Sequence, residues 1–531
     1  MSKKVLAVIL SLILAFSVVA VPVGAADGEA FNIENVFNTL IDKLISFVLT
    51  YLNRFWPGYD DAWETDDAYV PEHFYAGEET FDKEVVEGES KWSVGYSGAS
   101  LLDGIEPLSG DYFLAGTLEP IMGRVPTMVI DDQRVRVYAI SDGVSGVFVH
   151  AVIDGFGLSR GDVQEIRSRM EEFAKKYNII GINVSVLHQH SCIDTLGMNV
   201  PLAQALIFNT GNAASGGIIE DLKVEKNQEF MENLFQKTVL AMKKAVVNMK
   251  EGTLEYGNVD ISEYIRDKRD PQAFDPMLHR LKFTPDDLTT QIWILEAAIH
   301  ATGLGAGPEE LTADYPYYIE KEIREQVGAN VVFVQGAELA ITSETELIEV
   351  EEVTGFETMM EYGKTLGQKA ISIDNDIELD PVLNVVMKEV RLDVDNEILT
   401  LASREDVLNA VIVKTAEDYQ MITEIGYMEL GNKVAIFLCP GEFDPILFFG
   451  GPESGDASWS GEEWAYAPLK DHTTCEYVMV YGLCNDQAGY VLRDNEYHSM
   501  FTENEEINVI SKNAGSTFVN EFVALIASTA A

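Results

Sequence analysis

The chain has 531 residues, and its 87 acidic residues outnumber the 37 Lys and Arg residues, which gives a formal net charge of −50. A surface this acidic repels nucleic-acid phosphates and anionic lipid headgroups, which argues against nucleic acid as a partner and against electrostatic docking on a membrane. Hydrophobic residues still make up 47% of the chain. That share excludes an acidic disordered protein and is sufficient for a large core.

The first 26 residues are expected to be a secretory signal peptide. Lys3 and Lys4 precede an apolar run over residues 5–20, and small residues follow it as far as Ala26. An uncleaved membrane anchor is the alternative, but the run is short for about 30 Å of hydrocarbon. We therefore expect a secreted protein, in solution or attached to the cell surface, with no integral membrane span once the leader is removed.

Residues 27–90 are expected to be an acidic N-terminal extension that contains an amphipathic helix over residues 31–52. The helix is expected to pack on the main domain, and docking on a membrane surface is the alternative. No Pro/Gly-rich linker divides the chain after residue 91, so residues 91–531 are expected to form one domain. No obligate protein partner is evident.

Strand and helix patterns interleave along this domain. Strands are predicted over 135–141 and 145–152, with a hairpin turn at Asp142-Gly143, and over 184–190, 291–300, 329–334, 407–413 and 434–438. Helices are predicted over 160–177, 228–249 and 315–327. This interleaving indicates an α/β or α+β fold.

The four cysteines, Cys192, Cys439, Cys475 and Cys484, are too few to build a disulfide scaffold in a chain this long. None belongs to a CxxC pair, so a cysteine zinc site is not expected. One or two disulfides, or free thiols near the functional site, stay open.

Candidate functional residues stand near the ends of predicted strands. His188 and His190 alternate along one strand, so both imidazoles are expected on the same face. His300 ends an apolar run before a Gly-rich turn, Glu442 follows a strand in a Pro-Gly turn, and Tyr490 closes a Gly-rich segment. Taken alone, each residue favours a structural role over a metal site.

Together these segments resemble the catalytic domain of the neutral, non-lysosomal ceramidases. The matching segments, in order, are His188-Gln189-His190-Ser191, Ala298-Ile299-His300 with Ala313-Asp314-Tyr315-Pro316, Pro440-Gly441-Glu442, and Gly482-Leu483-Cys484-Asn485 with Gly489-Tyr490. Weaker matches lie at 95–97, 153–159 and 268–274. The resemblance extends over about residues 91–527, and it implies a layered αββα sandwich with mixed sheets. No C-terminal immunoglobulin-like domain is expected.

The resemblance also implies a site and an activity. His188, His300, Glu442 and Tyr490 match the family's zinc ligands, whereas His190 and Arg269 match residues that assist catalysis. The implied cofactor is Zn²⁺, and the implied reaction is hydrolysis of an N-acyl amide in a ceramide-like lipid by zinc-activated water.

The sequence departs from the family at a serine, because the corresponding position is Gly336 or Ala337. Ser191 and Ser343 are the candidate replacements. This departure leaves two alternatives open. One is a catalytically degenerate relative that binds a lipid or an envelope component, and the other is a zinc esterase or amidase with another substrate.

Overall fold

The computed structural model describes most of the chain after residue 63. The described ranges are 64–72, 81–116, 123–197, 227–269, 272–303, 309–348, 350, 355–404, 407–416, 418–451, 460–498 and 508–529. The predicted signal peptide and the predicted helix over 31–52 lie outside them. Within these ranges, no helix is long and apolar enough to span a membrane.

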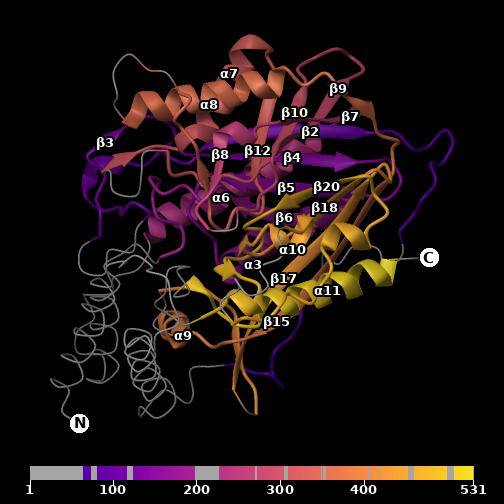
Figure 1. The fold of residues 1–531 in the computed structure, drawn as a ribbon. Coiled ribbons are helices and arrows are strands. Elements are labelled where there is room, and N and C mark those ends of the chain that lie inside the picture. The colour runs from indigo at the N-terminus through magenta and orange to yellow at the C-terminus, as the bar shows by residue number, and fades with distance from the viewer. Residues whose placement is uncertain are drawn as a thin grey trace, which may run out of the picture.

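Two mixed β-sheets form the centre of the fold (Figure 1). The larger sheet has nine strands in the order β12-β10-β9-β7-β2-β4-β5-β6, with β14 beside β7. Their bounds are β2 Ser93–Ser100, β4 Arg134–Ser141, β5 Val147–Ile153, β6 Ile179–Val186, β7 Lys250–Asp260, β9 Met277–Pro285, β10 Ile292–Ala297, β12 Asn330–Gln335 and β14 Ile377–Glu378.

The smaller sheet has six strands in the order β1-β16-β17-β18-β20, with β15 paired to β17. Their bounds are β1 Glu64–Thr65, β15 Leu383–Asp393, β16 Ile412–Lys414, β17 Tyr419–Leu430, β18 Val434–Leu438 and β20 Tyr477–Tyr481. Three short pairs complete the strands: β3 Met128–Val129 with β11 Glu310–Leu311, β8 Ile265–Asp267 with β13 Ile341–Ser343, and β19 Glu442–Phe443 with β21 Tyr490–Val491.

Helices cover the outer faces of the sheets. The described helices are α3 Arg160–Ser168, α4 Glu171–Tyr177, α6 Gln228–Val247, α7 Asp314–Gln326, α8 Gly355–Ile371, α9 Glu397–Arg404, α10 Ile446–Phe449 and α11 Ala514–Thr529. Helix α6 packs on β2, β4 and β5, and α11 packs on β15 and β17. Helices α7 and α8 pack against each other, and in Figure 1 they lie at the opposite end of the molecule from α11.

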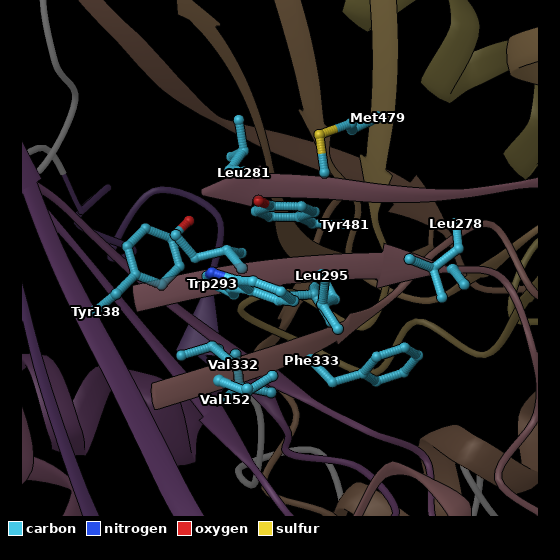
Figure 2. Packing of buried hydrophobic residues seen from close by; sticks show 14 of the residues in the cluster. Tyr138, Val152, Leu278, Leu281, Trp293, Leu295, Val332, Phe333, Met479 and Tyr481 are labelled. Carbon is cyan, nitrogen blue, oxygen red and sulfur yellow. The ribbon is translucent and has the colours of Figure 1, made fainter. Parts of the chain in front are cut away.

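The burial pattern of β4 accounts for the layers. Val135 and Val137 point to the cluster that holds α3, α4 and α6, whereas Tyr138 and Ile140 point to the cluster between the sheets. A strand buried on both faces has no polar alternation, and residues 135–141 are apolar except for Ser141 and Arg136. Figure 2 shows the core between the sheets, where Tyr481 of the smaller sheet lies near Trp293 of the larger one. The predicted layered α/β sandwich with mixed sheets is therefore confirmed.

Several predicted elements are confirmed and three need correction. The hairpin of β4 and β5 forms, and its turn is held by the Asp142 carboxylate, which accepts from the amides of Val144 and Ser145. The single helix predicted over 160–177 is wrong, because the chain breaks between α3 and α4, where Met170 turns into the core. The strand predicted over 184–190 ends at Val186, and residues 407–411 precede β16 without joining it.

Parts of the predicted N-terminal extension join the main fold. Glu64 and Thr65 form β1 and pair with β16, and the Phe81 ring stacks on Tyr427 with centroids 5.8 Å apart. All four cysteines are buried free thiols. The boundary at residue 91 stays a prediction.

Candidate metal and catalytic site

The candidate site forms where the segments that follow β6, β10, β12, β18 and β20 meet. Backbone hydrogen bonds join these segments, because the Gly482 amide donates to the Gln335 carbonyl and the Asn485 amide donates to the Val184 carbonyl. The Gln335 side chain adds two bonds, from its amide nitrogen to the Leu187 carbonyl at 3.1 Å and to the Ile299 carbonyl at 2.6 Å. Gln335 therefore fixes the chain next to both His188 and His300.

His188, His300 and Glu442 come together although they are far apart in the sequence. The Nε2 atoms of His188 and His300 lie 3.3 and 3.0 Å from the same Glu442 oxygen, Oε2. The other oxygen of Glu442 accepts from the Gln487 side chain at 3.1 Å. His188, His300 and Glu442 are all buried, so they form a small polar cluster in an otherwise apolar interior.

The two imidazoles are oriented as metal ligands are. Each Nδ1 lies against a backbone carbonyl, of Phe156 at 2.7 Å for His188 and of Ile341 at 3.1 Å for His300. A carbonyl only accepts, so each Nδ1 carries the proton and, in a neutral ring, Nε2 carries a lone pair. Burial lowers the pKa of His188 to about 4, which keeps that ring neutral at pH 7. Lone pairs aimed at a carboxylate oxygen need a shared cation, so this donor set fits a divalent metal such as zinc.

His188 reaches this position through an unusual backbone conformation. Its φ angle is +52°, in the left-handed region, because the chain turns as it leaves β6. The strand alternation predicted for residues 184–190 is therefore wrong. His188 and His190 nevertheless approach each other, with ring centroids 4.9 Å apart, and Phe156 stacks on His188 at 4.4 Å.

His190 lies beside the cluster without being hydrogen-bonded to it. Its ring is 5.8 Å from that of His300, between centroids, and neither ring nitrogen has a hydrogen-bond partner among the described residues. The side chain is partly exposed. Burial of the ring nitrogens, followed by the influence of His188, lowers the pKa of His190 well below its usual range. A neutral imidazole with unengaged nitrogens is able to accept a proton from a bound molecule.

Tyr490 lies beside Glu442 in a short parallel strand pair. β19 and β21 pair in the register Glu442 to Tyr490, which sets the two side chains on the same face. The close approach depends on Gly441, because a Cβ atom there would come within 2.6 Å of the Gly489 carbonyl. The segments Pro440-Gly441-Glu442 and Gly489-Tyr490 can therefore approach each other because residue 441 has no side chain.

Arg269 is held next to the cluster by an acid. Its guanidinium forms a fork on Asp444, with Nη2 to Oδ1 at 3.1 Å and Nη1 to Oδ2 at 3.4 Å, and Asp444 follows Glu442 closely in the chain. Arg493 binds the same carboxylate through Nε at 2.9 Å. Burial alone would raise the pKa of Asp444, but the charges and hydrogen bonds of the two arginines outweigh it and lower the pKa to about 2. The structure brings Arg269 to Asp444, not to the histidines.

Glu338 also belongs to this cluster, although the sequence motifs do not predict it. A carboxylate oxygen of Glu338, a carboxylate oxygen of Glu442 and a ring nitrogen of His188 lie within 4.8 Å of one another. Burial and then the Glu442 charge raise the pKa of Glu338 well above its usual range. A lone acid in the small and apolar run Gly336-Ala337-Glu338-Leu339-Ala340, directly after a buried strand, was the available signal.

Two other segments that match the family support the histidine segments. Asp154 accepts from the Gln189 side chain at 2.7 Å and so anchors the residue between the two histidines. Tyr315 donates its hydroxyl to the Ile299 carbonyl at 2.6 Å, directly before His300. These contacts explain why segments distant in sequence accompany the histidines.

The place of the family's serine is tightly packed. A Cβ atom at Gly336 would collide with Glu296 Oε1 and come within 3.1 Å of the Ala298 backbone. Of the two candidate replacements, Ser191 is buried with no hydrogen-bond partner for its hydroxyl among the described residues, and Ser343 lies in β13, which pairs with β8.

A second buried donor cluster, Asp275, His279 and Glu296, lies nearby in the larger sheet. His279 Nε2 is 2.9 Å from Asp275 Oδ2 and 3.8 Å from Glu296 Oε2. Burial raises the pKa of Glu296 to about 8. A His–Asp ion pair beside a neutral carboxylic acid accounts for this cluster without a metal.

Comparison with solved structures identifies proteins that share this fold. No protein-family model matches the chain, and neither does any curated protein. Solved structures do match: a neutral ceramidase from Pseudomonas aeruginosa has a TM-score of 0.60 at 14% identity, covering 82% of this chain and 74% of that one. A ceramidase complexed with C2 has a TM-score of 0.60 at 13% identity, covering 82% of this chain and 75% of that one. The two sheets and the helices that cover them thus form the fold of these neutral ceramidases.

Proposed function

We propose that the chain is a secreted, zinc-dependent hydrolase that cleaves an N-acyl amide in a ceramide-like lipid. The observation that supports this most is the pair of imidazoles whose Nε2 atoms meet one oxygen of Glu442, in a fold shared with neutral ceramidases. His188, His300, Glu442 and Tyr490 would hold the ion. Bound zinc would polarise the substrate carbonyl and lower the pKa of a coordinated water to about 7.

The chain's own residues supply orientation and proton movement. His188 and His300 keep their lone pairs aimed at the centre because backbone carbonyls hold the opposite ring nitrogens. His190 accepts a proton during attack and returns it to the leaving amine, since its ring is neutral and its nitrogens are unengaged. Arg269, fixed by Asp444, orients an oxygen of the substrate, since its side chain is partly exposed.

Metal content and fatty-acid release test the proposal together. Elemental analysis of the purified chain is expected to give about one zinc per molecule, as a mononuclear site requires. The chain is then offered ceramides, other N-acyl lipids and simple esters, and released fatty acid is measured. Glu442→Gln is expected to lose both zinc and activity. Glu296→Gln, which alters an equally buried glutamate in the neighbouring cluster, is expected to keep both.

The panel also separates the alternatives. Zinc with release from esters but from no N-acyl lipid would identify an esterase and refute the amide substrate. Zinc and lipid binding without any turnover would identify a degenerate binding protein, which is the candidate favoured by the absence of a serine at Gly336 or Ala337. A chain that takes no zinc even after reconstitution would refute the metal centre.

A further inference from the structure

Glu338 is a buried carboxylate that no hydrogen bond within the described residues stabilises. It follows β12, its side chain is fully buried, and neither of its oxygens has a hydrogen-bond partner among the described residues. A second carboxylate, Glu442, is its neighbour. A lone carboxylate in an apolar interior costs several kcal/mol unless it is paired, so this arrangement needs a compensating group.

A proton on Glu338 does not provide that compensation. The protonated acid would have an O–H donor, and no described residue offers an acceptor within hydrogen-bonding distance of either oxygen. A cation does provide it, because ligand atoms of Glu338, His188 and Glu442 lie within 4.8 Å of one another. His300 turns its Nε2 to the same Glu442 oxygen as His188 does. One divalent ion would satisfy all four side chains.

We infer that Glu338 is a second carboxylate ligand of the metal centre, so that the protein set around the ion includes His188, His300, Glu442 and Glu338. The inference rests on the metal centre of the proposed function, and it adds a ligand that stands in the segment where the family carries a serine. Two carboxylates and two neutral imidazoles balance the charge of a divalent ion. A charge-balanced ion is the arrangement that a dry, buried site favours.

Metal binding by the purified full chain tests the assignment directly. The chain is stripped with a chelator and titrated with zinc against a competing indicator, and in parallel with Co²⁺, whose d–d absorption reports the ligand set. Glu338→Gln keeps the size of the side chain and removes the charged ligand. We expect it to weaken zinc binding by about 100-fold or more, and to change the Co²⁺ spectrum, because even residues that only support ligands cost 10–100-fold.

Two further variants make the result specific. Glu338→Asp keeps the charge on a shorter side chain and is expected to bind zinc more tightly than Glu338→Gln. If Glu338→Gln does not fold, Glu338→Asp still tests the assignment, because the shorter side chain is expected to weaken zinc binding relative to the wild type. Glu296→Gln is the matched control, since Glu296 is also buried and also has an oxygen without a partner. We expect it to bind zinc with wild-type affinity and to give the wild-type Co²⁺ spectrum.

The contrary outcomes are distinct. Wild-type zinc affinity and an unchanged Co²⁺ spectrum in Glu338→Gln would overturn the inference, and a loss of turnover alone in that variant would make Glu338 a general base instead of a ligand. Loss of zinc in Glu296→Gln but not in Glu338→Gln would move the metal to the Asp275 cluster. A chain that binds zinc through Glu338 but hydrolyses nothing would support the inference and refute the proposed function. A wild-type chain that takes no zinc refutes both.

Discussion

His300 and Glu442 are 142 positions apart in the chain, yet His300 Nε2 lies 3.0 Å from Glu442 Oε2. The contact joins the two sheets, because His300 follows β10 of the larger sheet and Glu442 follows β18 of the smaller one. Neither sheet alone carries the donor set. The site therefore depends on how the sheets are fastened to each other at their ends, and residues that never touch a metal are expected to control its affinity.

Gln335 is the clearest example of such a positioning residue. Its amide nitrogen donates to the carbonyls of Leu187 and Ile299, which immediately precede His188 and His300. Gln335→Met keeps the length of the side chain and leaves both carbonyls without this donor. We expect zinc affinity to fall by about 10- to 100-fold, as it does when support behind a ligand is lost. Competition with a zinc indicator measures the change.

A control separates this effect from general destabilisation. Gln133 also donates from its amide nitrogen to a buried carbonyl, that of Asp154, at 2.8 Å. Gln133→Met is expected to lower the free energy of unfolding by about 1–3 kcal/mol, as loss of a buried hydrogen bond does, with much less effect on zinc affinity. Equal losses of affinity in the two variants would contradict the role of Gln335.

Arg269 is expected to act on the substrate and not on the metal. Lysine cannot reproduce the fork that Arg269 makes on Asp444. For Arg269→Lys we expect kcat/KM to fall by about 10- to 100-fold, which is the loss of one charged hydrogen bond, with zinc content unchanged. Steady-state kinetics and elemental analysis of the same preparation provide both readings.

Arg493→Lys alters the other partner of Asp444 and is expected mainly to lower the melting temperature. Loss of zinc in Arg269→Lys, in parallel with its loss of activity, would show that Arg269 only clamps the segment that carries Glu442.

Restoring a serine at Gly336 is expected to harm the protein. A Cβ atom there collides with Glu296 Oε1 and crowds the Ala298 backbone. We expect Gly336→Ser to lower the free energy of unfolding by about 1–3 kcal/mol, which is the usual cost of overpacking, and not to raise activity. Urea unfolding measures the loss, and Ala337→Ser, at the other candidate position for the family's serine, is measured in parallel. A gain of turnover in Gly336→Ser at unchanged stability would mean that the lost serine is the missing catalytic group.

How far the sequence predicts the site depends on whether each residue is placed by local or by distant contacts. His300 follows an apolar strand and precedes a turn, so local pattern suffices to place it at a strand end. The pairing of His188 with His190 was predicted from strand alternation, but a left-handed φ at His188 brings the rings together instead. A single left-handed residue where the chain leaves β6 leaves no trace in hydrophobic periodicity.

Glu338 is a site residue that local sequence pattern does not reveal. In a chain with 87 acidic residues, one more glutamate after a strand carries little signal. What distinguishes Glu338 is its complete burial and its approach to His188 and Glu442, and both depend on how the sheets meet. The break between α3 and α4 has the same origin, because the burial of Met170 in the core overrides the helical pattern of the surrounding residues.

The stability of the fold is expected to depend on pH through His150. This ring lies between β4 and β6, with Nε2 2.8 Å from the Ser185 hydroxyl and Nδ1 3.3 Å from the Tyr138 hydroxyl, and burial lowers its pKa to about 3. The unfolded chain takes up a proton near pH 6.5 whereas the folded chain does not, so His150 lowers stability as pH falls from about 6.5 towards 3. Relative to His150→Gln, whose amide keeps both hydrogen bonds and does not titrate, the wild-type free energy of unfolding is expected to fall by about 2 kcal/mol between pH 8 and pH 5. Urea unfolding of both proteins at the two pH values measures this difference, in which the other titrating groups cancel. A difference that stays constant with pH would mean that His150 takes up a proton in the folded protein at the same pH as in the unfolded chain.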